Sequence, residues 1–319
     1  MSTVSTDPEG KAPPIASKQR FGRGDRAFSG LALLAGITIM VALAAVFVFL
    51  AIRGSQGLNV DPSLYPNAGN FALYAAKLLF GTVWVSVVAM CFAVPFSVAL
   101  ALFISHYAPR WLATPVAYVI DLLAAIPSVV FGLWGLRSFA QAMKPVTAWL
   151  NDHLGWIPFF SGTVSASGRS VLIAAMVLAV MIIPITTAIA REVFAQTPRL
   201  NEEAALALGA TRWEMIRYAV FPYARSGLIA GVMLGLGRAL GETMAVTFVL
   251  GAENPLVTIK MLTADSPPTI ASNIAQNFQG ENVDQQVVLL ATGLVLFVFT
   301  FAVNFIARAV VGRQERKLA

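Results

Sequence analysis

The chain has 319 residues, of which 57% are hydrophobic and only 12% are charged, and its mean hydropathy is +0.73. This composition excludes an ordinary water-soluble domain and predicts an all-α membrane protein. The formal net charge of +6 needs no nucleic-acid partner, because the position of the basic residues relative to the apolar runs accounts for it.

Residues 1–28 are rich in Pro, Gly, Ser and charge, and we predict a disordered cytoplasmic tail there. Residues 29–319 are predicted to form one transmembrane domain with its core at 77–311 and a cytoplasmic loop at 191–227. Six apolar runs are each long enough to cross about 30 Å of hydrocarbon as a helix. They cover residues 30–52, 77–104, 116–139, 171–189, 227–250 and 287–311.

The first run is expected to be a retained anchor helix, because its apolar core is too long for a cleaved signal peptide. With the N-terminus inside, most basic residues outside the runs fall in cytoplasmic segments. This bias predicts that both termini are cytoplasmic.

Two outer segments connect the later runs. Residues 140–170 carry Trp149, Trp156, Phe159 and Phe160, which indicates interfacial anchoring or a short re-entrant element. Residues 251–286 are rich in Asn and Gln, so we expect them to face an aqueous compartment where they could meet a partner.

The cytoplasmic loop has the signals of a helical hairpin. Pro198 suits a first helical turn, and Gly209 suits a left-handed C-terminal position. Thr211 with Glu214 three residues later is a capping-box pattern. Pro222 marks the end of the second helix or a kink in it. We therefore predict a helix, a glycine elbow and a second helix, which form a docking surface at the membrane.

A charged pair lies within the fifth apolar run. Arg238 is about 15 Å from the start of that run, near mid-membrane, and an arginine there costs on the order of 3 kcal/mol on insertion scales. Glu242 lies four residues later, where the two side chains can meet on one helix face. The pair is either part of an anion pathway or a structural ion pair that sets helix register.

Smaller features have two interpretations each. The glycine spacings 231/235 and 237/241 permit close helix packing. Asp121 is expected to contact a neighbouring helix or the cytoplasmic loop rather than cargo. Pro127 and Ser128 indicate a helix kink or a pore-lining position.

Several kinds of chemistry have no signal in the chain. Gly10 and Lys11 lack the upstream glycine of a phosphate-binding P-loop, and no catalytic constellation occurs. The single Cys91 excludes a disulfide framework, while His106 and His153 fall in different predicted compartments, so no metal site is predicted. The chain is therefore expected to be no enzyme and to bind no cofactor. Its energy would come from another chain or from an ion gradient.

The hairpin resembles the "EAA" loop of ABC-importer permeases. The resemblance rests on Glu203, Ala204 and Ala205, followed by Gly209 and then by Pro222. In that family the loop is the coupling helix that sits in a groove of a cytoplasmic ATPase. The resemblance therefore implies that these five residues couple the chain to an ATPase, and that ATP is used by that partner.

A second resemblance narrows the family. Residues 238–246, 125–135 and 293–297, with Asn304 and Ala307–Arg308, are similar to the PstC family of phosphate-importer permeases. The sister family PstA shares the Gly-Glu-Thr core but typically follows it with Ala-Pro. Met244-Ala245-Val246 at this place favours PstC.

The resemblance implies a type I importer permease with the MetI-like fold in a bacterial inner membrane. It implies a phosphate pathway that includes Arg238, Glu242, Thr243 and Ser128. The implied partners are a homologous second permease, two cytoplasmic ATPase subunits and a periplasmic phosphate-binding protein. Two alternatives stay open from the residues themselves. One is an ABC permease for another oxyanion such as sulfate or molybdate, and the other is an ion-coupled secondary anion carrier.

Overall fold

The computed structural model describes residues 23–61, 65, 68–250, 257–265, 268–279 and 282–318. Contacts divide the chain into two units, residues 1–48 and 49–319. Helix α1 (Arg23–Gln56) begins in the first unit, and its described side chains up to Val48 are exposed and almost wholly apolar. Of the predicted tail, residues 1–22 lie outside the described residues. Residues 23–28 belong to α1.

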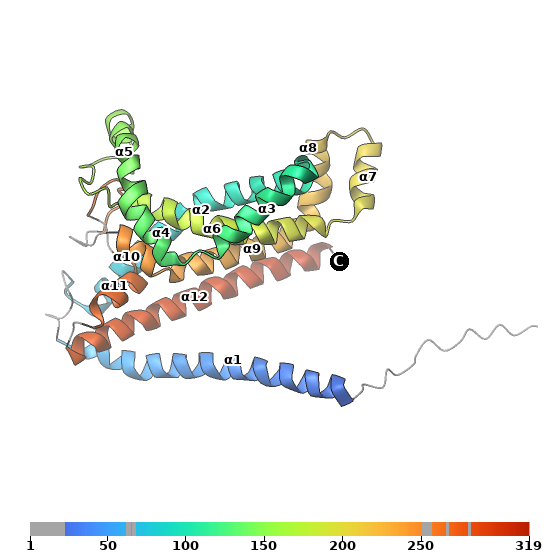
Figure 1. Cartoon of the computed structure of the whole chain (residues 1–319). Helices are drawn as coiled ribbons and strands as arrows, with labels where there is room; N and C mark the ends of the chain where they lie inside the picture. The colour runs from blue at the N-terminus through green and yellow to red at the C-terminus, as the bar shows by residue number, and fades with distance from the viewer. Residues whose placement is uncertain are drawn as a thin grey trace, which may run out of the picture. The chain divides into compact units, whose positions relative to one another are not determined.

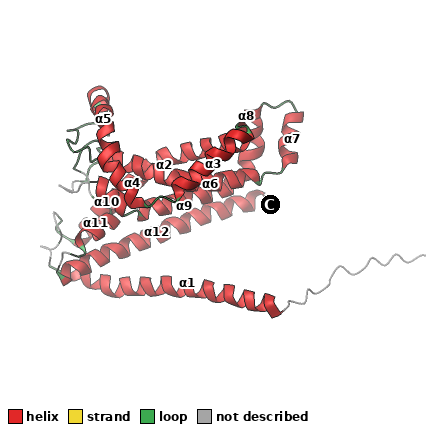
Figure 2. Ribbon diagram, in the orientation of Figure 1, coloured by secondary structure: helices red, strands yellow, loops and turns green. Residues whose placement is uncertain are grey.

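The second unit is built of helices throughout its described part (Figure 2). After the end of α1 and a short 3-10 turn, Gly57–Asn59, the order is α2 (Phe71–Leu102), a π-turn (Phe103–Tyr107), α3 (Arg110–Ala124), α4 (Ser128–Trp134), a π-turn (Gly135–Phe139), α5 (Ala140–Leu154), α6 (Val171–Ala195), α7 (Arg199–Ala207), α8 (Arg212–Met215), a π-turn (Ile216–Val220), α9 (Phe221–Gly241), α10 (Met244–Val249), α11 (Ile270–Asn277) and α12 (Val283–Leu318).

Helix α6 is the centre of this unit. It packs against α2 on one side and α9 on another, with α3 also in contact (Figure 1). In its most apolar stretch 67% of the residues are buried, compared with 39% in α2 and 22% in the helix that includes α9. The remaining apolar surface of α2 and α9 faces lipid or another subunit.

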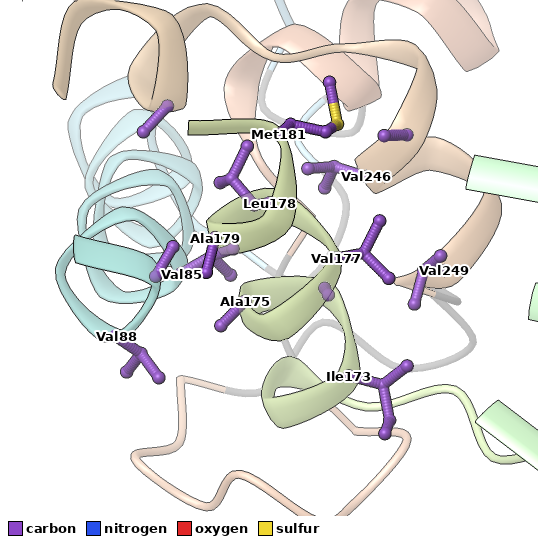
Figure 3. Close-up of a cluster of buried hydrophobic side chains, with 14 of the residues drawn as sticks. Val85, Val88, Ile173, Ala175, Val177, Leu178, Ala179, Met181, Val246 and Val249 are labelled. Atoms are coloured by element: carbon purple, nitrogen blue, oxygen red, sulfur yellow. The ribbon is translucent and has the colours of Figure 1, made fainter. Parts of the chain in front are cut away.

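Three buried clusters follow one another along the bundle. The largest joins α2, α6 and α10, and includes Val85, Val177 and Val249 (Figure 3). A second cluster, at the hairpin end, joins Leu102, Phe194 and Ile216 with their neighbours. The third packs Tyr65, Tyr74, Leu78, Ile270 and Val288 at the opposite end. Buried apolar packing therefore stabilises both ends of the bundle as well as its middle.

The apolar spans lie where the sequence predicts them, and two of the predicted runs differ in form. In the described residues five helices are long and apolar enough to cross a membrane, and the bent pair of Arg110–Ala124 and Ser128–Leu154 makes a sixth if it is counted as one span. The third run was predicted as one helix over 116–139, which is wrong. The helix ends at Ala124 and restarts at Ser128 after a bend of 95°. Pro127 lacks an amide hydrogen and disfavours helical geometry at Ile126, so the chain breaks there.

The fifth run, predicted as continuous over 227–250, is also interrupted. Helix α9 ends at Gly241, and α10 begins at Met244. At its other end, α9 follows directly from α8 through the π-turn at 216–220, so Pro222 does not end a helix. The wider π-turn accommodates a residue that cannot donate a backbone hydrogen bond.

Candidate functional site

The cytoplasmic hairpin folds as its sequence predicts. Gly209 has φ +86°, the left-handed conformation expected of it, and separates α7 from α8. The Thr211 hydroxyl accepts from the Glu214 amide at 3.3 Å, and the Glu214 carboxylate accepts from the Thr211 amide at 2.8 Å. This reciprocal capping box fixes the start of α8. Helix α7 begins at Arg199, one residue after the predicted first-turn position Pro198.

The inner side of the hairpin contacts the ends of the spans. A Glu202 carboxylate oxygen lies 3.6 Å from Nε2 of His106, which is in the π-turn that follows α2. Ala205 is partly buried and packs on the cluster that contains Phe194 and Ile216. A movement of the hairpin would therefore be transmitted to α2, α6 and α9 together. Sequence reasoning did not identify His106, because nothing local indicates that residues 106 and 202 meet.

The outer side of the hairpin is open. Glu203, Ala204 and Gly209 are exposed. Large apolar side chains accompany them, with exposed fractions of 91% for Leu208 and 55% for Trp213. A soluble surface rarely leaves such side chains uncovered, so this side has the character of an interface.

Pro222 is separate from that open surface. It is the second residue of α9 and is exposed. It borders an apolar groove of about 650 Å³, which lies between α2 and α9 and includes Val94, Val98 and Arg225. Pro222 therefore belongs to the segment that connects the hairpin to the span of α9, and not to the docking surface.

Arg238 lies near the middle of the apolar layer. The stretch from Arg169 to Arg191, most of it α6, has no charged residue between those arginines and covers about 33 Å at helical rise. Arg238 is almost one turn beyond Gly235, which packs on Ile182 of α6. Ile182 is about 14 Å from Arg191 along the helix, so Arg238 lies close to the middle of the stretch of about 33 Å.

The expected meeting of Arg238 with Glu242 does not occur. No ion pair within 4.0 Å joins these two described residues, because α9 ends at Gly241 and Glu242 adopts an extended conformation. The Glu242 carboxylate is buried and accepts a hydrogen bond of 3.2 Å from the Ala245 amide. It caps α10 instead of neutralising Arg238. The Thr243 hydroxyl donates to the Gly241 carbonyl at 3.1 Å.

The guanidinium of Arg238 has an unused donor. Its Nε is buried and has no hydrogen-bond partner in the described structure. Gly237 and Gly241 lie next to it and one turn beyond it in the sequence, and a Cβ at either glycine would find no atom within 4 Å. An unpaired buried donor is costly, so this nitrogen is a candidate to bind an acceptor.

The two helix breaks lie at the same level. Gly132 of α4 packs on Ala245 of α10, and Gly135, one turn later, packs on Val249. The two helices therefore run in the same direction. Counting back from these contacts puts Ser128, the first residue of α4, level with Glu242. Irregular backbone at membrane depth occurs where it is buried in protein or lines a cavity.

The glycines of α9 separate into two groups. Gly227, Gly231 and Gly235 face α6, where an added Cβ would lie within 3.0 Å of Val193, Ile189 and Ile182 respectively. The spacing 231/235 is thus used for helix packing, whereas 237/241 is open. Gly227, which was not predicted from the sequence, extends the packed row by one further turn.

Asp121 behaves as expected of a contact with a neighbouring helix. Its carboxylate lies 3.7 Å from the guanidinium of Arg191 on α6. Half of the surface of the Asp121 side chain is exposed, and a third of the surface of the Arg191 side chain is exposed. Such a pair is a weak contributor to stability.

A multi-pass bundle with an exposed docking hairpin at one end and two facing helix breaks in its middle is the arrangement of a membrane transport permease. Residues 93–316 match the family described as binding-protein-dependent transport system inner membrane component, and the chain belongs to this family. It is a permease subunit of an ABC importer and not itself an enzyme, and it works with other subunits.

Close relatives cover nearly the whole chain. The "Phosphate transport system permease protein PstC 2" of Mycobacterium tuberculosis is 42% identical, and the match covers 96% of this chain and 98% of that protein. The "Phosphate transport system permease protein PstC" of Xylella fastidiosa is 38% identical, with 99% of each covered.

A solved structure supports the fold. A crystal structure titled as a bacterial ABC transporter involved in the import of the acidic polysaccharide alginate contains a similar chain. The TM-score is 0.62 at 15% identity, over 91% of this chain and 98% of that one. At this identity the likeness concerns the helical architecture, which is the all-α, type I importer fold expected from the sequence.

Proposed function

We propose that this chain is the permease through which an ATP-driven importer moves inorganic phosphate across the bacterial inner membrane. The observation that carries the proposal is the buried, unpaired Nε of Arg238 at mid-membrane, on a helix where Gly237 and Gly241 leave open positions. The names of the relatives from Mycobacterium tuberculosis and Xylella fastidiosa support phosphate as the cargo.

The chemistry of the site suits a tetrahedral oxyanion. Arginine stays charged and presents a planar set of donors that matches phosphate oxygens. Gly237 and Gly241 allow an anion to approach both the guanidinium and the backbone. Ser128 and Thr243, at the two helix breaks, add hydroxyl groups to the same level of the membrane. Glu242 holds the start of α10 and so keeps the break in place.

The proposed assembly contains a homologous second permease, two cytoplasmic ATPase subunits and a periplasmic phosphate-binding protein. The exposed side of the hairpin, with Glu203, Ala204 and Gly209, would dock on an ATPase, and Ala205 on its inner side would transmit the contact to the spans. This chain binds no cofactor of its own, and ATP is used by the partner.

A mechanical route connects the hairpin to the break. The residues from Arg212 to Gly241 form one uninterrupted helical path of 30 residues. Closure of the ATPases on the hairpin would displace α8, and α9 would carry that displacement to Arg238. The π-turn before Phe221 is the one place along this path where the helix is locally widened and can bend. Pro222 lies directly after it.

The central experiment measures uptake by vesicles that contain the full complex. Arg238→Gln removes the charge and keeps similar volume, so we expect phosphate uptake to fall to background while the subunits still co-purify. Arg225→Gln is the matched control, because Arg225 is an exposed arginine on the same helix. Normal uptake by the Arg238 variant would reduce this residue to a structural role.

Cargo is tested with the same vesicles. The vesicles should take up labelled phosphate and no labelled sulfate, and sulfate uptake that excess phosphate leaves unchanged would contradict phosphate as the cargo. Sulfate or molybdate uptake without phosphate uptake would favour the other oxyanion. Uptake that needs an ion gradient and no ATP would favour the secondary carrier.

A further inference from the structure

Helix α5 exposes an apolar stripe that the transport pathway does not use. Val146 and Trp149 are exposed to 43% and 54%, and Trp156, just beyond the helix, to 80%. Ala142 and Pro145 lie on the same side and are also exposed. The opposite side is covered, since Ala140 and Thr147 are buried there. No described residue covers the stripe.

The helix runs across the direction of the spans. The segment Ser128–Leu154, which contains α4 and α5, is bent by 95° from α3. Helix α3 packs along α6, a membrane-crossing helix. In Figure 1 α5 projects sideways from the bundle of α2, α6 and α9. A helix at right angles to the spans lies along the plane of the membrane.

Hydrogen bonds fix the depth of α5. Gln141 donates to the Ser167 carbonyl at 3.3 Å, and Asn151 donates to the carbonyls of Phe160 and Gly162 at 2.8 Å each. Arg169, directly after this loop, marks the end of the uncharged stretch that covers about 33 Å. Helix α5 is thus held at the edge of the apolar layer, at the end opposite the hairpin.

The direction of the stripe follows from the same loop. In Figure 2 the loop after α5 lies beyond α5 as seen from the α7–α8 hairpin. The covered side of α5 faces this loop, so the exposed stripe faces back toward the level of the spans. That level is occupied by lipid around the bundle. Tryptophan is enriched where acyl chains meet headgroups, and an apolar stripe on a helix in the membrane plane is the mark of an interfacial helix.

We propose that α5 rests on a phospholipid surface, with Val146, Trp149 and Trp156 inserted at the boundary of headgroups and acyl chains. The helix would anchor the segment whose first turn forms the break at Ser128. Lipid would then support one wall of the pathway from outside the bundle. The proposal depends only on the geometry of α5 and not on the cargo.

Spin labels test the contact in the assembled transporter. Single cysteines replace Val146, Trp149 or Ala148 in a Cys91→Ser chain, and the complex is reconstituted in vesicles of phosphatidylcholine and phosphatidylglycerol. Ala148 is the matched control, because it is exposed on the same helix but lies outside the stripe. Collisions of each label with oxygen, which concentrates in lipid, are compared with collisions with a water-soluble nickel chelate.

We expect labels at 146 and 149 to favour oxygen and the label at 148 to favour nickel. Preference for nickel at all three positions would overturn the proposal. Exclusion of both reagents at 146 and 149 would also overturn it, because a protein partner would then cover the stripe. Phosphate uptake by the same vesicles is an independent readout, so a failure of the lipid contact is distinguishable from a failure of the transport assignment. Val146→Cys is a conservative change and keeps the test usable if Trp149→Cys does not assemble.

Discussion

Gly227 offers a quantitative test of how α9 packs on α6. A Cβ at this glycine would lie 2.5 Å and 2.7 Å from the two methyl carbons of Val193, and 3.2 Å from its Cβ. Carbon atoms pack best at about 3.5–4.0 Å. Rotation of the Val193 side chain cannot clear the space, because its Cβ and both of its methyl carbons are close to the new Cβ. Gly227→Ala must therefore push α9 from α6 by about 1 Å, and such overpacking costs about 1–3 kcal/mol.

Gly237→Ala is the matched control on the same helix. Its Cβ would meet no atom within 4 Å. Both substitutions gain about 1 kcal/mol of helix propensity, so the difference between them isolates the packing term. At about 2–4 °C per kcal/mol, we expect the purified complex with Gly227→Ala to unfold roughly 2–12 °C below the complex with Gly237→Ala. The assay is the apparent unfolding midpoint in detergent at one fixed scan rate.

A compensating change completes the test. Val193→Ala removes both methyl carbons that the new Cβ would meet, so the double variant should recover most of the loss produced by Gly227→Ala. The coupling between the two sites is read from a double-mutant cycle. Equal midpoints for Gly227→Ala and Gly237→Ala, or no recovery in the double variant, would refute the packing argument.

Three further predictions concern single contacts. Thr211→Ala should weaken the start of α8 by about 1 kcal/mol, seen as faster proteolysis within the hairpin and poorer retention of the ATPase, whereas Thr211→Ser should keep both. Gly132→Ala should lower the unfolding midpoint, because its Cβ would lie 2.9 Å from the Ala245 backbone, which cannot rotate away; a midpoint equal to that of Gly237→Ala would contradict the close approach of α4 and α10. Asp121→Asn should change stability by no more than about 1 kcal/mol, since the pair with Arg191 is largely exposed. A large loss in that variant would indicate a role beyond the pair.

Local signals in the sequence predicted much of the cytoplasmic hairpin. Gly209 adopts its left-handed conformation and Thr211 caps α8 with Glu214, because these features depend on residues within one or two helical turns. The contact between His106 and Glu202 could not be predicted in this way. It joins residues almost a hundred positions apart, and only the tertiary fold brings the π-turn after α2 next to α7.

The membrane site shows the same division. Composition identified the spans, and the cost of a charge in lipid singled out Arg238. The predicted pairing with Glu242 failed because it assumed a continuous helix. Glu242 caps the next helix instead, and Arg238 is left with an unused donor.

From the sequence alone it follows that this chain crosses a membrane, presents a capped hairpin and places an arginine at mid-depth. These properties follow from hydropathy, local backbone preference and helical rise, which act along the chain. The folded structure was needed to show that the breaks at Ser128 and Glu242 lie level, and that Gly227, Gly231 and Gly235 face α6 while Gly237 and Gly241 stay open. Those facts depend on which helix faces of distant segments meet, and that is settled by packing.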